Sequence, residues 1–344
     1  MERCGLTESL FRHRLAHMTE RSAGKLKTGR ITCCAVVVSL FLALSVSALG
    51  QQNPSSDGTV DQGDGSTTFK VDVKLVNVFV SVQDQNGAPV ASLKKDDFQL
   101  FEDDHQEKIA LFSRESELPL SIVLGIDASL STRKDLKLEL ESARRFARSI
   151  VRPQDGLALF EFSEVVNEIL PFTSDLRKID QGVQQIKTGS ATALYDAIYL
   201  GADALEKRRG RKVMVLITDG GDTMSKTDYK EAVRAAQEAE AIIYSIIVVP
   251  IEADAGRDIG GEHALMEISR TTGGKHYYAN SIASLDKAFA QIGEELRTQY
   301  LLAYYPSRRL TESDFRRIQI QVTGEGDSKL KARYRAGYYT TKSH

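Results

Sequence analysis

The sequence contains no tryptophan and only three cysteines, Cys4, Cys33 and Cys34, all near its start. Because no thiol follows residue 34, the remaining residues cannot form a disulfide, a thiolate zinc site or a cysteine nucleophile. The formal net charge is -2, so there is no global basic field of the kind that attracts nucleic acid. We also find no P-loop and no Gly-x-Gly-x-x-Gly after the first strand of the α/β region, which argues against a nucleotide site.

What the sequence does contain begins with a candidate export signal. Residues 1–30 carry seven Lys or Arg against three Glu, and residues 31–49 carry no charge. This pattern is typical of a signal at residues 1–50, either a cleaved signal peptide or an uncleaved signal anchor. Residues 51–68 are rich in Ser, Gly, Asp and Gln and predict a flexible linker. We therefore expect an exported protein, periplasmic, envelope-associated or secreted, whose membrane contact is limited to a possible N-terminal anchor.

Beyond the linker, the hydrophobic periodicity changes twice. Residues 69–117 alternate apolar and polar side chains, residues 118–299 alternate apolar strands with amphipathic helices, and residues 300–341 return to strand-like segments. The middle region predicts a mostly parallel sheet with helices on both faces. Each flanking segment has too few strands to be stable alone, so we predict that the two form one small β-sandwich-like domain. We expect the tyrosines of the last region to pack in its sheets: Tyr300, Tyr304, Tyr305, Tyr334, Tyr338 and Tyr339.

Oxygen-bearing side chains gather where segments of the α/β region end. The apolar strand SIVLGID ends in Asp127, with Ser129 and Ser131 after it, KVMVLITD ends in Asp219, and Thr192 precedes the helical segment ALYDAI. Ligands of open α/β sheets bind at the carboxyl ends of strands, so these five residues are candidates for one site. Carboxylates and hydroxyls suit Mg²⁺, Mn²⁺ or Ca²⁺ better than zinc. An ion held partly by neutral hydroxyls can accept one more carboxylate, which a partner protein could supply.

The D-x-S-x-S loop, with a Thr at a helix start and an Asp after a later strand, resembles the metal-ion-dependent adhesion site of von Willebrand factor A (VWA) domains. The resemblance covers about residues 119–297. It implies a Rossmann-like fold with one antiparallel edge strand, and a protein-binding role without enzymatic activity. It further implies that Ser129, Ser131 and Thr192 contact the metal, Mg²⁺ first among the candidates, and that Asp127 and Asp219 act directly or through water.

A narrower resemblance extends to the flanking β-segments. DFQLFEDD before the α/β region and YRAGYY near the C-terminus are similar to segments of VWFA-related proteins typical of acidobacteria. Many bacterial VWA domains have Gly between the two serines, where this chain has Leu130. That position contributes no ligand, so the departure concerns the shape of the rim and leaves the metal site intact.

Several alternatives remain open at this point. Asp127 or Ser131 could cap the next helix, and Asp222 is expected to be a solvated loop residue. A metal-dependent hydrolase or phosphatase could use the same acids, although phosphatases of the haloacid-dehalogenase type need a second Asp where Ser129 stands. The domain could also be a structural module with an unoccupied site.

Overall fold

The fold comes from a computed structural model that describes residues 75–114, 118–129, 136–249, 258–308, 315–323 and 330–340. The predicted export signal, the linker, Leu130 and Ser131 lie outside these ranges. Contacts group Phe69–His344 into one compact unit, which includes the α/β region and both flanking β-segments. Within the described ranges, no helix has the length and apolar character needed to cross a membrane.

A six-stranded sheet forms the centre of the α/β region, in the order β10-β9-β8-β5-β6-β7. All neighbours in it are parallel except β7, which pairs antiparallel with β6 at one edge. Every residue of β5 is buried, because both faces of the sheet are covered, and this explains its continuous apolar run. The predicted α/β fold class with one antiparallel edge strand is confirmed. The strands are β5 Leu120–Asp127, β6 Gly156–Phe162, β7 Val166–Thr173, β8 Arg211–Thr218, β9 Ile242–Val248 and β10 His276–Ala279.

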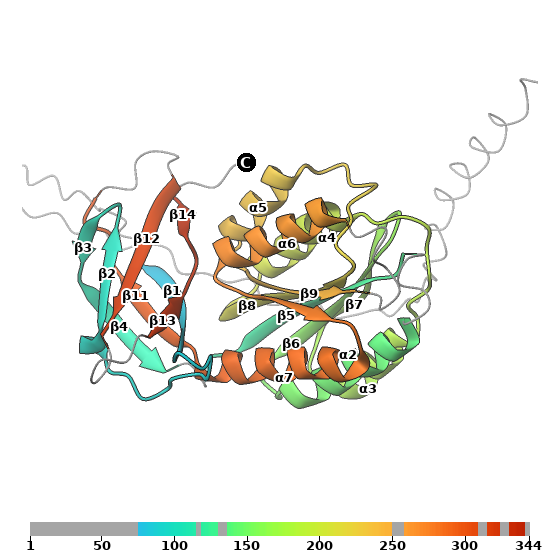
Figure 1. The fold of residues 1–344 in the computed structure, drawn as a ribbon, viewed down its shortest axis with the longest axis horizontal. Coiled ribbons are helices and arrows are strands. Elements are labelled where there is room, and N and C mark those ends of the chain that lie inside the picture. The colour runs from blue at the N-terminus through green and yellow to red at the C-terminus, as the bar shows by residue number, and fades with distance from the viewer. Residues whose placement is uncertain are drawn as a thin grey trace, which may run out of the picture. The chain divides into compact units, whose positions relative to one another are not determined.

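Helices cover both faces of this sheet (Figure 1). One face packs against α2 Leu136–Ile150, α3 Leu176–Val183 and α7 Ile282–Thr298, and the other against α4 Leu194–Glu206, α5 Tyr229–Glu238 and α6 Ile259–Thr272. Alternation along β5 sends Ile122 and Leu124 into the first core and Val123 into the second. Between α2 and α7, the rings of Phe146 and Phe289 stack with their centroids 4.5 Å apart. These two cores hold the strand ends in place.

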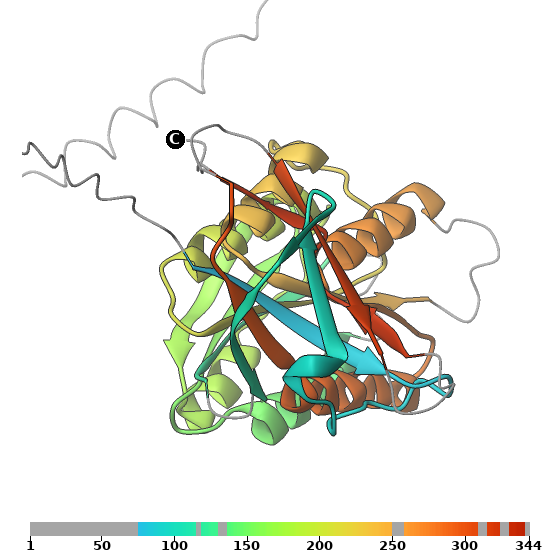
Figure 2. The same cartoon turned by 90° about the vertical axis from the view of Figure 1, so that its left-hand side faces the viewer.

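Two four-stranded sheets make the β-part, in the orders β13-β1-β11-β4 and β14-β12-β2-β3. Each combines strands from before and after the α/β region, since β1 pairs with β11 and β2 with β12. Figure 2 shows these early (blue to teal) and late (orange to red) strands side by side. The prediction that strands from the two flanks pack together is confirmed. Its elements are β1 Val76–Gln83, the 3-10 helix η1 Lys95–Asp97, β2 Phe98–Glu102, β3 His105–Glu107, β4 Ile109–Arg114, β11 Tyr300–Tyr304, β12 Phe315–Val322, β13 Lys331–Arg333 and β14 Gly337–Tyr339.

A buried carboxylate joins the two flanks inside this β-part. Glu102, from the DFQLFEDD segment, accepts hydrogen bonds from the hydroxyls of Tyr304 and Tyr338 at 2.7 and 2.8 Å and forms an ion pair with Arg316 at 2.7 Å. Tyr338 belongs to the YRAGYY segment, so the two segments that carry the narrower resemblance meet here. The prediction of packed tyrosines holds for Tyr300, Tyr304 and Tyr338, which are buried, but it is wrong for Tyr305, which is 53% exposed.

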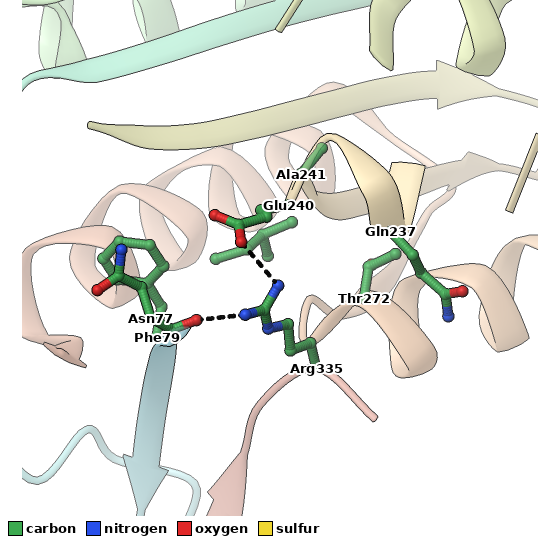
Figure 3. A pocket seen from close by; sticks show the side chains of 8 residues that line it. Asn77, Phe79, Gln237, Glu240, Ala241, Thr272 and Arg335 are labelled. Carbon is green, nitrogen blue, oxygen red and sulfur yellow. Dashed lines mark hydrogen bonds and ion pairs between the residues drawn. The ribbon is translucent and has the colours of Figure 1, made fainter. Parts of the chain in front are cut away.

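The β-part and the α/β region share polar contacts. Glu295 of α7 is buried and accepts hydrogen bonds from Ser81 of β1 at 2.9 Å and from Tyr244 of β9 at 2.6 Å. Arg335 donates to the Asn77 carbonyl at 2.6 Å and lies 3.4 Å from the Glu240 carboxylate (Figure 3). The cavity beside Arg335 has a volume of about 20 Å³, which is far too small for an organic ligand. These contacts therefore join the two parts, and the small cavity beside Arg335 is a packing gap.

Candidate functional site

Asp127 is the last residue of β5 and is fully buried. Its Oδ1 accepts the Ser129 backbone N–H at 2.9 Å, and its Oδ2 accepts the Thr218 hydroxyl, from the end of β8, at 2.7 Å. Burial raises the pKa of Asp127 to about 6 although these hydrogen bonds oppose the shift, and the neighbouring charge of Asp219 raises the pKa further. A carboxylate in this position is stabilised in its ionised form by a cation, which fits a metal site.

Asp219 stands directly after β8, the strand that pairs with β5. The chain turns sharply behind it, because Gly220 has a φ of +103° and donates its N–H to the Thr218 hydroxyl at 3.1 Å. The turn leaves the Asp219 side chain partly exposed beside the buried Asp127. Adjacent parallel strands thus end in two carboxylates at the same edge of the sheet.

The loop that carries Thr192 is tied to the other two loops by backbone hydrogen bonds. Gly189 donates to the carbonyl of Ala128 at 2.7 Å, next to Asp127, and Thr223 donates to the carbonyl of Thr192 at 2.9 Å. Thr192 itself is 5% exposed. The structure thereby brings the loops of Asp127, Ser129, Thr192 and Asp219 together, while Ser131, the fifth predicted ligand, lies outside the described residues.

Asp222 has a structural role that the sequence did not predict. Its Oδ1 accepts the backbone N–H of Leu194 at 2.9 Å and of Tyr195 at 3.3 Å, so it caps α4 from the loop after β8. The expectation of a solvated loop residue is therefore wrong. A signal was available in the sequence, because the residue before α4 is Ala193, whose side chain cannot cap a helix.

A further carboxylate, Glu164, lies at the edge of the site. It accepts the backbone N–H of Ser190 at 2.7 Å and the Ser190 hydroxyl at 3.1 Å. These hydrogen bonds lower the pKa of Glu164 to about 2, so its side chain stays ionised. Glu164 is exposed and adds negative charge beside the loop of Thr192.

The combined donor set consists of carboxylate and hydroxyl oxygens. The loops at residues 127–131, 188–192 and 219–223 contain neither histidine nor cysteine. Across the part of the chain that the structure describes, no three His, Cys, Asp or Glu side chains gather as a metal-binding group. A site of two carboxylates completed by hydroxyls is compatible with that finding, and its chemistry fits a hard divalent ion.

Comparisons with known proteins bear on the same region. The family model described as the von Willebrand factor type A domain matches residues 121–291. Solved structures that are similar include BatB from Bacteroides thetaiotaomicron, with 21% identity, a TM-score of 0.42 and coverage of 51% of this chain and 98% of that chain. The von Willebrand factor type A protein from Catenulispora acidiphila has 10% identity, a TM-score of 0.46 and coverage of 78% and 75%.

A third similar structure is the vWF domain of the type V pili tip protein Mfa5 from Porphyromonas gingivalis. It has 14% identity, a TM-score of 0.41 and coverage of 52% of this chain and 94% of that chain. A search of curated protein sequences gave no match. The family match covers the strands and helices that carry Asp127, Thr192 and Asp219.

Proposed function

We propose, from the match of residues 121–291 to the von Willebrand factor type A domain, that the protein is an exported adhesion or assembly protein that binds a partner through a divalent ion. The partner supplies a carboxylate to the ion. Export rests on the sequence pattern of residues 1–50, and the linker predicted from the composition of residues 51–68 would give the folded unit its reach.

The observation that carries this proposal is the buried Asp127 among loops of oxygen donors. Its pKa of about 6 means that the folded protein holds an ionised carboxylate at neutral pH against an unfavourable burial. Asp127, Ser129, Thr192 and Asp219 would hold the ion, with Ser131 as the further ligand suggested by the sequence. When bound, Mg²⁺, Mn²⁺ or Ca²⁺ supplies an electrophilic position for an acidic side chain.

Binding is the chemistry that these residues support best. Both oxygens of Asp127 accept a hydrogen bond, one from the Ser129 N–H and the other from the Thr218 hydroxyl, so this carboxylate is held in one orientation and keeps further lone pairs for an ion. The proposal therefore assigns a protein partner to the site and no reaction.

The test is capture of partners from an envelope fraction by the immobilised protein, with and without EDTA. We expect bound proteins that EDTA releases and that Thr192→Ala fails to capture. Ser190→Ala is the matched control, since this neighbouring hydroxyl bonds to Glu164 and is not a predicted ligand. Capture that is insensitive both to EDTA and to Thr192→Ala would contradict the proposal.

A further inference from the structure

Three large apolar side chains are exposed around the proposed metal site, two on loops and one at the start of α6. Val165, Met224 and Ile259 are 56%, 56% and 76% exposed, and we call them the apolar rim. Single apolar side chains scattered over a surface need no explanation, and what distinguishes these three is their position beside the loops of the proposed site.

Backbone contacts place the first two members of the apolar rim beside Thr192. Met224 donates its N–H to the carbonyl of Thr192 at 3.1 Å. The turn of Val165 reaches the same loop, because the Val165 carbonyl accepts the Ser163 N–H at 3.0 Å and the Ser163 carbonyl accepts the Ala193 N–H at 2.7 Å.

The third member lies beside the turn that follows Asp219. Ile259 is the first residue of α6, and the adjacent Asp258 caps this helix by accepting the Gly261 N–H. The helix start packs closely on the turn, since a Cβ at Gly261 would lie 1.6 Å from the Gly220 carbonyl oxygen. The apolar rim therefore borders the loops that carry both Thr192 and Asp219.

Two exposed acids accompany the apolar rim. Glu164 precedes Val165 and Asp258 precedes Ile259, and both side chains are solvent-exposed. The charge of the ion compensates the one partner carboxylate that binds to it. A second acidic side chain on the partner would have no such compensation, and Glu164 and Asp258 would repel it.

We propose that the partner presents a single Asp or Glu flanked by bulky apolar side chains, and that the apolar rim selects this segment over an acidic tract. This inference rests on the proposed function of the metal site. The apolar flanks would cover Val165, Met224 and Ile259, while the lone acid reaches the ion.

The test uses three fluorescent peptides of equal length in excess Mg²⁺. Each has a central Asp, flanked on both sides by Leu, by Ser or by Asp, and binding is measured by fluorescence polarisation. We expect the Leu-flanked peptide to bind about tenfold more tightly than the Ser-flanked one, because apolar surface is buried, and the Asp-flanked peptide to bind most weakly. The double variant M224S/I259S should lose the preference for Leu. Leu200→Ser is the control, since Leu200 is 43% exposed on α4, away from these loops.

Calorimetry with Mg²⁺ alone, on the same samples, separates the two proposals. If Mg²⁺ binds but the Leu-flanked peptide binds no more tightly than the Ser-flanked one, or M224S/I259S keeps the preference, the inference is overturned and the proposed function stands. If Mg²⁺ does not bind, the proposed function fails as well.

Discussion

At the residue scale, Asp127 links the stability of the fold to the ion. Its folded-state pKa of about 6 lies above its ordinary value of 3.8. The metal-free folded protein therefore binds more protons than the unfolded chain between about pH 4 and pH 6. Because protonation of Asp127 favours the folded state, the free energy of unfolding falls as the pH rises through that window. At pH 7 the buried charge costs on the order of 3 kcal/mol in the free energy of unfolding.

Asp127→Asn should consequently have opposite effects with and without metal. In EDTA at pH 7, the variant should unfold at a higher denaturant concentration than wild type, and the difference should vanish near pH 4. With excess Mg²⁺, wild type should be stabilised and the variant should not. Urea unfolding across this pH range is the measurement. If the variant is less stable than wild type in EDTA at pH 7, the ionised Asp127 carboxylate does not lower the free energy of unfolding, and this prediction is contradicted.

At the element scale, the start of α4 depends on the loop that follows β8. Asp222 caps α4 from that loop, while Asp228 caps α5 from the position directly before it and accepts the Glu231 N–H at 2.8 Å. Each cap contributes about 1 kcal/mol to stability. Only the cap of α4 also positions a predicted metal ligand, Thr192.

Asp222→Ala and Asp228→Ala therefore form a matched pair. We expect similar losses of stability in urea unfolding, but only Asp222→Ala should weaken Mg²⁺ binding, by about tenfold or more, because it releases the loop that carries Thr192. Equal Mg²⁺ affinities in the two variants would contradict this role of the α4 cap.

The same elements show what the sequence could predict. Continuous apolar runs ending in Asp127 and Asp219 predict buried parallel strands and the edge where ligands bind, since burial on both faces leaves a clear local pattern. The cap of α4 joins residues 28 positions apart, and the bond from Tyr338 to Glu102 joins residues 236 positions apart. No local periodicity records such contacts, so they became visible only in the folded chain.

At the scale of the whole molecule, α7 connects the two parts of the folded unit. It ends at Thr298, and a single residue, Gln299, separates it from β11 of the β-part, which begins at Tyr300. Near its end, the buried Glu295 bonds to Ser81 and Tyr244 and forms an ion pair with Arg333. We infer from these shared contacts that the β-part and the α/β region unfold together.

Glu295→Ala tests this coupling by differential scanning calorimetry. The substitution removes the carboxylate that pairs with Arg333, so we expect the free energy of unfolding to fall by about 3 kcal/mol. The protein should still unfold in one cooperative transition, at a lower temperature. Glu294→Ala, at the neighbouring exposed position, should leave the transition unchanged. Two separate transitions, of which the substitution moves only one, would show that the parts are independent.

The central claim is that the loops after β5 and β8 and before α4 hold a divalent ion. Titration of the full-length protein with Mg²⁺ in an isothermal calorimeter tests it most directly. We predict saturable binding at one site in wild type and in Asp228→Ala, and loss of binding in both Asp127→Ala and Asp219→Ala. Equal Mg²⁺ affinity in wild type and Asp127→Ala would contradict the claim.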